Sequence, residues 1–399
     1  NKSSSMTSDT TKQRFLSSPR LPRLSATSTA FSETPMRITL LGAGHIGQTI
    51  AHLLAASGDY EVTVVDRSAT ALAKLESLPV QTRQAETAEP QALLEVLRGR
   101  DAVVNALPYH LATLAATQAR EAGCHYFDLT EDVAATRAIK QLAEGAATVF
   151  MPQCGLAPGF IGIVAHHLAQ GFDSLHEVKM RVGALPAFPT NALKYNLTWS
   201  VDGLINEYCH PCEAIRGGRN IEVLPLEGME HFSLDGTEYE AFNTSGGLGT
   251  LCETLAGRVQ TLDYKSVRYP GHRDLMKMLL EELQLKDDTE TLKDIMRKSI
   301  PSTMQDVVLV FVTVSGLREG SLVQEVFARK IFADRSESHP LSAIQITTAA
   351  GICAALDLFR EGKLPQRGFV RQEQVALPDF LANRFGSAYQ QSRQVESIG

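Results

Sequence analysis

The sequence predicts an α/β protein in which a doubly wound parallel sheet carries an inserted α+β domain with a mostly antiparallel sheet. From Arg37 onward, short β-branched strands alternate with amphipathic helices, a pattern typical of parallel sheets. After Gly155, strands follow one another with turn residues between them, which is typical of antiparallel sheets. We therefore expect a parallel-sheet domain over 36–155, an α+β domain over 156–340, and C-terminal helices over 341–385 that pack back on the first domain.

The parallel-sheet region begins with an apolar strand, RITLLGA, that ends in a glycine-rich turn. Ile46, Ile50, Leu53 and Leu54 then fall on one face of a helix. The further elements follow in this chain order, with two helices in succession after the second strand: strand 60–66, helix 71–78, helix 90–99, strand 101–108, helix 109–123, strand 124–130, helix 137–146 and strand 148–155.

The second region begins with a loop and a helix over 155–172. Strands are then expected over 177–185, 221–226, 230–234, 238–244, 261–269, 306–320 and 322–332. A helical pattern returns over 344–365, where Gly362 and Pro365 stop it.

The composition is that of a globular chain with a sizeable core. The 399 residues are 44% hydrophobic and 21% charged, with a net charge of −7 and a pI of about 5.9. We therefore expect no binding surface for nucleic acid or for an anionic membrane. No apolar run approaches the roughly 18 to 20 residues of a membrane span, because threonines and Asp357 interrupt the best candidate, 344–359.

Six scattered cysteines are not a disulfide framework for a chain of this length, and they indicate reduced thiols in a cytoplasmic protein. Cys209 and Cys212 form one C-x-x-C, but no second pair stands at the spacing of a zinc site, so we expect no metal. Residues 1–35 are rich in Ser and Thr and lack apolar periodicity, so we expect a disordered tail. Its composition resembles a transit peptide; a fusion remnant or an overlong start before Met36 is the alternative.

A glycine motif after the first strand predicts a dinucleotide site. Gly42, Gly44 and Gly47 form G-x-G-x-x-G at the start of a helix, where they allow a tight turn, close approach of a pyrophosphate, and close helix packing. His45 and Ile46 lie within the motif and are included in the predicted cofactor site. The arrangement is that of a Rossmann domain; the alternative is a purely structural glycine turn.

The acid at the end of the second strand bears on the choice of cofactor. Asp66 is placed to accept hydrogen bonds from the adenosine ribose and to repel a 2′-phosphate, which favours NAD. Arg67 beside it can pair with that phosphate, so NADP is the alternative.

Polar residues at the ends of the later parallel strands are expected near the nicotinamide, because ligands bind at the carboxyl ends of such strands. These are Asn105, Leu107 and Pro108, and then Asp128 with Glu131. Asn105 and Pro108 can equally form only a turn, and Asp128 can equally cap one.

Three stretches of the second domain place polar residues at expected strand ends. Tyr195 lies in LKYNLTWSVDGL, and Thr244 with Ser245 lies in a hydroxyl- and glycine-rich loop suited to an anion. Arg268 and His272 flank a Pro-Gly turn, where arginine can grip a carboxylate and histidine can move a proton.

Seven motifs resemble, in their order along the chain, those of the saccharopine dehydrogenase family, and most of all its lysine 6-dehydrogenase branch. They are LLGAGHIG, DAVVNALPYH, YFDLTED, PQCGLAPGFIGIVA, LKYNLTWSVDGLI, EAFNTSGGLGTL and VRYPGH. The resemblance runs from about residue 36 to about residue 380. It implies a Rossmann domain, an inserted domain with substrate and dimer contacts, and a homodimer. It also implies NAD(P)-linked oxidation at a carbon that bears an amine, which in the lysine branch is oxidative deamination of L-lysine at its 6-amino group.

For this chemistry a base must remove a proton from the substrate nitrogen, and the candidates are Asp128, His272 and Tyr195. A small amino-acid substrate would place its carboxylate on Arg268 and the Thr244–Ser245 loop. The stretch LTED with its Glu131 resembles the saccharopine-type members instead. A saccharopine or carboxyspermidine-type enzyme that joins or splits a secondary amine is therefore one alternative. A non-catalytic NAD-binding regulator is the second.

Overall fold

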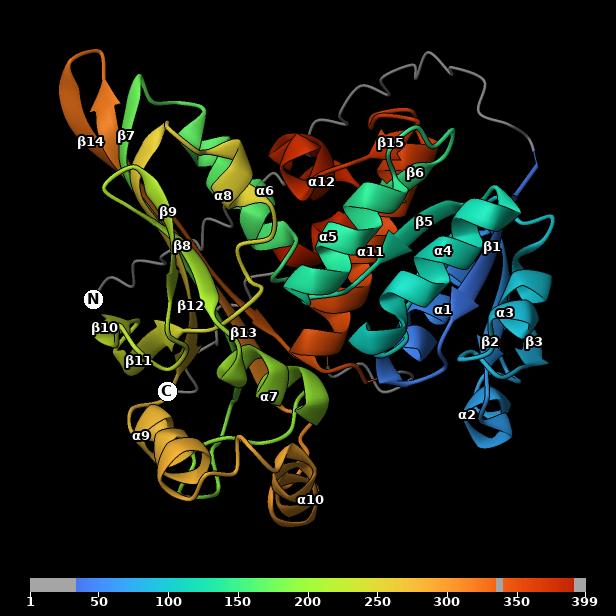
Figure 1. Ribbon diagram of the computed structural model, residues 1–399, viewed down its shortest axis with the longest axis horizontal. Helices are drawn as coiled ribbons and strands as arrows, with labels where there is room; N and C mark the ends of the chain where they lie inside the picture. Colours follow the sequence, from blue (N-terminus) through green and yellow to red (C-terminus); the bar gives the residue numbers. More distant parts are fainter. Residues whose placement is uncertain (1–33, 335–339, 391–399) are drawn as a thin grey trace, which may run out of the picture. The chain divides into compact units, whose positions relative to one another are not determined.

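The protein is described here by a computed structural model that covers residues 34–334 and 340–390 (Figure 1). The expected disordered tail, 1–35, therefore lies outside the described residues except for its last two positions. The predicted fold class is confirmed, because the described chain contains a parallel sheet flanked by helices and a second, mostly antiparallel sheet.

The first sheet has seven strands in the order β15-β6-β5-β4-β1-β2-β3, and every neighbouring pair is parallel. Its strands are β1 (Met36–Leu41), β2 (Tyr60–Asp66), β3 (Gln81–Gln84), β4 (Ala102–Asn105), β5 (His125–Asp128), β6 (Val149–Met151) and β15 (Gly368–Phe369). The helices between them are α1 (His45–Ser57), α2 (Ala69–Ala73), α3 (Pro90–Leu97), α4 (Ala112–Ala122) and α5 (Val133–Leu142), with a 3₁₀ turn at Tyr109–Leu111. Strand order reverses beside β1, which is where ligands bind in such sheets.

Side-chain alternation explains why helices cover both faces of this sheet. Leu41 and Val103 pack with α3, α4 and α5 in one buried cluster, whereas Leu40 and Val104 pack with α1 in another. β3 and β15 were not predicted. All four residues of β3 are exposed, so it has no apolar pattern, and β15 has only two residues.

The second sheet has the order β10-β11-β12-β7-β13-β14, with β8 and β9 extending from β12, and only the β7–β12 pair is parallel among its described pairs. Its strands are β7 (Ser174–Pro186), β8 (Cys212–Arg216), β9 (Arg219–Val223), β10 (Glu230–Leu234), β11 (Thr237–Asn243), β12 (Val259–Arg268), β13 (Asp306–Arg318) and β14 (Ser321–Phe332). The remaining helices are α6 (Phe160–Ala169), α7 (Val201–Cys209), α8 (Leu251–Thr254), α9 (His272–Lys277), α10 (Thr289–Ser299), α11 (Ala343–Arg360) and α12 (Leu377–Ala382). Shorter turns are a π-helical one at Met278–Glu282 and 3₁₀ turns at Gln372–Gln374 and Gly386–Gln390.

One stretch expected at a strand end has a different structure. The segment around Tyr195 is a loop that leads into α7, and the Ser200 hydroxyl caps this helix by accepting a hydrogen bond of 3.2 Å from the amide of Gly203. A serine hydroxyl that accepts from the amide three positions later is typical of the start of a helix, and it identifies the stretch as a helix N-terminus.

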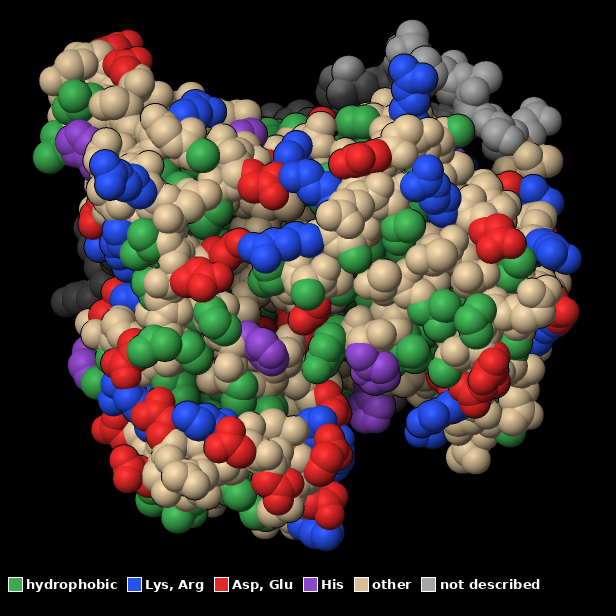
Figure 2. Space-filling model, viewed as in Figure 1, with side chains coloured by type: hydrophobic (Ala, Val, Ile, Leu, Met, Phe, Trp, Pro, Cys, Tyr) green, Lys and Arg blue, Asp and Glu red, His purple; other side chains and the backbone are tan. Residues whose placement is uncertain are grey.

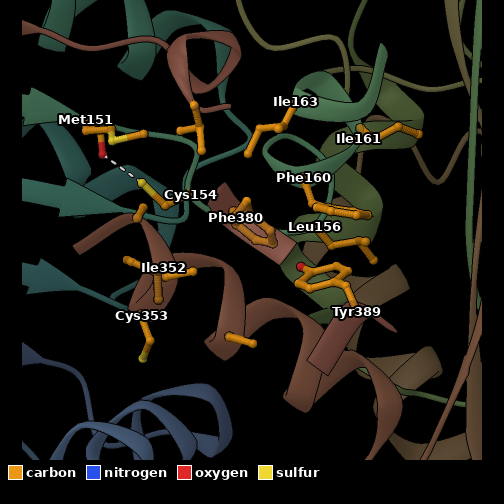
Figure 3. Packing of buried hydrophobic residues seen from close by; sticks show 14 of the residues in the cluster. Met151, Cys154, Leu156, Phe160, Ile161, Ile163, Ile352, Cys353, Phe380 and Tyr389 are labelled. Atoms are coloured by element: carbon orange, nitrogen blue, oxygen red, sulfur yellow. Dashed lines mark hydrogen bonds between the residues drawn. The ribbon is translucent and has the colours of Figure 1, made fainter. Parts of the chain in front are cut away.

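The core between the two sheets is built around α6 and the C-terminal helices (Figure 3). The ring of Phe160 lies 4.0 Å from that of Tyr389 and 5.2 Å from that of Phe380, measured between centroids. The buried Asp357 of α11 accepts a hydrogen bond of 2.6 Å from the hydroxyl of Tyr60 on β2. The last helices are thereby fastened to the first sheet.

The expectation that no apolar run has the length of a membrane span needs a correction. α11 has 18 residues and a mean hydropathy of 1.2, so by length and composition it could cross a membrane. Its hydropathy window is 83% buried inside the described protein, as is usual for a core helix.

Candidate functional site

The glycine motif forms a cradle at the start of α1. A Cβ on Gly47 would lie 2.0 Å from the carbonyl oxygen of Gly42, and one on Gly42 would lie 2.9 Å from that of Ala106. Both positions therefore require glycine for packing. A Cβ on Gly44 would meet no atom within 4 Å, so there is open space at the helix N-terminus. This combination fits a dinucleotide pyrophosphate, whose charge the helix amides favour.

The loop that follows β2 is fixed by Asp66. One carboxylate oxygen accepts the amide of Ala43 at 2.7 Å and the other accepts that of Ser68 at 2.8 Å. Arg67 is exposed directly beside this carboxylate. Within the motif His45 is exposed and Ile46 is partly buried.

At the end of β4 the chain forms a turn, which is one of the two alternatives that the sequence leaves open for Asn105 and Pro108. The side-chain oxygen of Asn105 accepts the amide of Leu107 at 3.1 Å, and its amide group donates to the hydroxyl of Tyr126 at 3.0 Å. Leu107 keeps part of its surface open to solvent and Pro108 is exposed.

Asp128 is engaged by the protein itself. Its carboxylate accepts hydrogen bonds from the Tyr126 hydroxyl at 2.8 Å and from the amides of Gln153 at 2.9 Å and Thr130 at 3.0 Å. Burial raises the pKa of Asp128 to about 6, although these hydrogen bonds oppose the shift. The carboxylate joins the ends of β5 and β6, so the structure favours the turn-capping interpretation over a role as base.

The loop after β11 does not have the role predicted for it. The Thr244 hydroxyl pairs with that of Ser266 at 2.8 Å. The Ser245 hydroxyl donates to the carbonyl oxygen of Pro211 at 3.1 Å, and its amide donates to that of Glu207 at 3.0 Å. The structure therefore contradicts the prediction that Ser245 binds a substrate carboxylate and gives Thr244 an internal partner.

The glycines of the same loop serve close packing. Gly246 has φ +87°, and a Cβ there would lie 2.3 Å from the carbonyl oxygen of Glu131. A Cβ on Gly247 would lie 2.2 Å from the ring of Tyr264. The loop thus presses the second domain against the turn after β5, which brings Glu131 next to the second sheet.

Arg268 and His272 meet through a residue that the sequence did not single out. Arg268 Nε donates to the hydroxyl oxygen of Tyr208 at 3.0 Å, and this oxygen lies 3.1 Å from His272 Nε2. His272 Nδ1 lies 2.9 Å from the carbonyl oxygen of Leu193, which can only accept, so Nδ1 carries the proton and Nε2 accepts from Tyr208. The ring of Tyr195 lies 5.3 Å from the guanidinium and supports it.

These contacts change the roles expected for two candidate bases. Burial and the charge of Arg268 lower the pKa of His272 to about 3, so the ring is neutral and both of its nitrogens are bonded. Burial raises the pKa of Tyr195, which is 1% exposed. His272 therefore fixes Tyr208, which binds Arg268, and the ring of Tyr195 packs against the guanidinium.

Arg268 itself is a buried cation without a carboxylate partner among the described residues. It is 3% exposed, and no carboxylate of the described residues lies within 4.0 Å of it. Burial opposes its charge, but Tyr208, Tyr195 and Glu207 favour the charge, and its pKa is raised. A substrate carboxylate would satisfy it.

Glu207 of α7 completes the site, together with Glu131. Gly203 lies one turn before Glu207 on the same helix face, and Glu131 Oε1 is 3.1 Å from where a Cβ on Gly203 would stand. Burial and Glu131 raise the pKa of Glu207 to about 8, against the effect of Arg268; burial raises the pKa of Glu131 to about 7. Neither carboxylate accepts a hydrogen bond from another described residue. An acid on the otherwise apolar face of α7 was the sequence signal that could have identified Glu207.

The candidate site draws on both domains, since Glu131 of the first domain lies beside Gly203 of the second. Figure 2 shows a notch in the surface between the regions of α10 and α2. Among residues 34–334 and 340–390, no group of three or more His, Cys, Asp or Glu side chains could hold a metal ion. Cys209 and Cys212 are free thiols at the end of α7 and the start of β8.

Comparisons with known proteins agree with this architecture. The family described as saccharopine dehydrogenase NADP binding domain matches residues 38–151, and that described as saccharopine dehydrogenase C-terminal domain matches residues 155–386. The saccharopine dehydrogenase [NADP(+), L-glutamate-forming] of Saccharomyces cerevisiae is 22% identical over 348 residues, which are 83% of this chain and 74% of that protein. The structure of the apo histidine-tagged saccharopine dehydrogenase (L-Glu forming) from Saccharomyces cerevisiae has the same fold, with a TM-score of 0.71 at 17% identity over 86% of this chain and 96% of that one. The chain belongs to the saccharopine dehydrogenase family and is an NAD(P)-binding oxidoreductase.

Proposed function

We propose that the protein oxidises a carbon–nitrogen bond in a secondary amine of the saccharopine type. Hydrolysis of the oxidised bond then gives two products, an amino acid and an aldehyde. The activity for which its yeast relative is named supports this substrate class over the lysine branch expected from the sequence. The observation in this chain that carries the proposal is Arg268, a buried cation without a carboxylate partner among the described residues. The carboxyl group of Glu207 influences the charge of Arg268, and Glu131 in turn influences that of Glu207.

In this proposal Arg268 binds a carboxylate of the substrate, with Tyr208 and His272 holding the guanidinium. Hydride can leave the carbon only when its nitrogen is neutral, so a base must first take the proton. Glu131 follows β5 at the cofactor edge of the first sheet and has a pKa of about 7, so we assign it this role in place of Asp128 and His272. The nicotinamide, when bound, accepts the hydride. Water then adds to the carbon–nitrogen double bond and the amine half leaves.

Oxidative deamination of lysine is the second candidate, and the charges of the site favour it. One arginine and two carboxylates complement the one carboxylate and two ammonium groups of free lysine. In that reaction ammonia leaves instead of an amino acid.

The two candidates differ in their products. The purified protein should be incubated with oxidised cofactor and either saccharopine or L-lysine, while formation of reduced cofactor, glutamate and ammonia is measured. Reduction of the cofactor in the presence of saccharopine, with release of glutamate, would support the first candidate. Reduction of the cofactor in the presence of lysine, with release of ammonia, would support the second. Lack of turnover with both amines, in a protein that binds cofactor, would favour the non-catalytic regulator.

For the cofactor we propose NADP, with Arg67 contacting the 2′-phosphate. The description of the family that matches the first domain and the name of the yeast relative support NADP over the NAD expected from Asp66. Both oxygens of Asp66 accept backbone amides, and Arg67 is exposed beside them. Arg67→Ala should weaken the binding of NADP about tenfold or more, because one charge-assisted hydrogen bond is lost. The binding of NAD should change little. Tighter binding of NAD by the unaltered protein would contradict the choice.

We also propose a homodimer, as the resemblance implies. Leu322 and Val326 of the edge strand β14 are 70% and 52% exposed, which would suit an interface. Sedimentation of the purified chain tests this, and a monomer at high concentration would rule it out.

A further inference from the structure

We propose that Glu207 binds the free α-ammonium group of the substrate while Arg268 binds the adjacent carboxylate, so that the site selects a zwitterionic α-amino-acid end. This inference rests on the proposed function in one respect only: the substrate must be an amino acid. It names the end of the molecule that is held, which the proposed reaction leaves open.

Glu207 differs from the other buried acids of the described chain. It is 5% exposed, and its carboxylate has no hydrogen bond and no ion pair with any described residue. By contrast, the buried Glu240 accepts the amides of Gly271 and Arg273, each at 2.7 Å, and Asp263 pairs with two arginines. A buried carboxylate without a donor is costly unless a ligand supplies one.

The cation near Glu207 does not satisfy it. Arg268 influences the charge of Glu207, yet no nitrogen of the guanidinium lies within 4.0 Å of the carboxylate. Arg268 is held back by its bond to Tyr208, the residue next to Glu207 in the chain. A carboxyl group and a guanidinium are therefore fixed in one domain without contact. A ligand that carries an ammonium group next to a carboxylate would satisfy both, because the ammonium favours the ionised form of Glu207.

The residue that precedes Glu207 in the chain is another buried acceptor without a partner in the described chain. Asn206 is 7% exposed and its side-chain oxygen has no hydrogen-bond partner among the described residues. Unpaired acceptors call for a ligand that donates hydrogen bonds, which an ammonium group does with three N–H bonds. An N-substituted amine with a bulky second half has fewer donors and needs more room.

The position of Glu131 agrees with this assignment. Its carboxylate lies beside Gly203, one helical turn from Glu207, and a turn rises about 5.4 Å. A substrate held by its α-amino-acid end at Glu207 would extend a short chain to a second nitrogen near Glu131. In a saccharopine-type molecule this end is the half with the free α-amino group, and the secondary amine is then the nitrogen that reacts.

The test measures binding without turnover. NADPH is present at saturation, so the probes L-lysine and 6-aminohexanoate cannot be oxidised; the two differ only in the α-ammonium group. We expect calorimetry to give about tenfold or more tighter binding of L-lysine, because a hydrogen bond between charged groups is made. Glu207→Gln should abolish the preference. Glu213→Gln, which makes the same change at a carboxylate paired with Arg137, should retain it.

Equal binding of both probes by the unaltered protein would overturn the inference, as would a preference that survives in Glu207→Gln. If that variant does not fold, Glu207→Asp keeps the charge and should retain a weaker preference for L-lysine. Loss of the preference in a folded Glu207→Asp protein would also argue against the assignment. Because no turnover is needed, a protein that shows the preference but oxidises no amine would refute only the proposed function.

Discussion

The phenolic oxygen of Tyr208 accepts a hydrogen bond of 3.0 Å from Arg268 Nε and hydrogen-bonds His272 in turn. All three side chains are buried. Because the tautomer of His272 is set by a backbone carbonyl, the chain of donors runs in one direction, from the guanidinium to the imidazole. The guanidinium is thereby fixed at Nε, and its Nη1 donates to the carbonyl oxygen of Val267 at 2.8 Å. The donors that are left are kept in a defined orientation for a carboxylate.

Replacement of Arg268 tests this arrangement. Arg268→Lys keeps the charge but loses both the bond to Tyr208 and the bidentate fork. We expect KM for the amino-acid substrate to rise about tenfold or more, with the Kd of the cofactor nearly unchanged. Steady-state kinetics and cofactor titration measure the two constants, and the exposed Arg219→Lys serves as a control. Equal weakening of substrate and cofactor would mean that Arg268 supports the fold.

Much of the fold could be predicted because its signals are local. The strand Tyr60–Asp66 is β-branched and the helix His45–Ser57 has an apolar face, so each is visible in its own residues. β3 was missed because its pairing to β2 comes from neighbours, and its own sequence, QTRQ, carries no apolar pattern. The helix α7 was missed because its start follows a long loop without periodicity.

The site was harder to predict because it depends on residues that are distant in sequence. Arg268 was identified from its type and position, but its partner Tyr208 is 60 residues away. His272 was expected to be a base from its residue type, and only its two hydrogen bonds and its burial show otherwise. The hydroxyls of Thr244 and Ser245 looked available in sequence, but folding gives each an internal partner.

The assignment of Glu131 as base predicts a pH dependence. Burial raises its pKa to about 7, above the ordinary value of about 4.3 for glutamate. Since only the charged carboxylate can take a proton, kcat/KM should rise with pH up to and through about 7. Glu131→Gln should lower kcat about a hundredfold or more and remove this acid limb. A pH–rate profile of the variant with the limb unchanged would exclude Glu131 as the base.

The same physics makes Glu207 a stability determinant. Its folded pKa of about 8 lies above its unfolded value, so the folded state binds the proton more tightly. Its contribution is therefore fully present below the unfolded pKa and is lost as the pH rises through about 8. Glu207→Gln should leave the thermal midpoint similar at about pH 4 and raise it relative to the unaltered protein at about pH 9, by the equivalent of about 2 to 4 kcal/mol. A midpoint difference that does not grow with pH would show that Glu207 is not buried as a charge.

The two glycines at the start of α1 should respond in opposite ways to the same substitution. In Gly47→Ala the new Cβ meets the Gly42 carbonyl oxygen at 2.0 Å, so the strand and helix must separate, and we expect a loss of about 2 kcal/mol or more in the free energy of unfolding. In Gly44→Ala the Cβ enters open space, so the fold should keep its stability. The methyl group then occupies the space proposed for the pyrophosphate, and the Kd of the cofactor should rise about tenfold or more. Denaturant unfolding and cofactor titration of both variants separate the two effects. If Gly44→Ala binds NADP and NAD as the unaltered protein does, the pyrophosphate does not approach the backbone at this glycine.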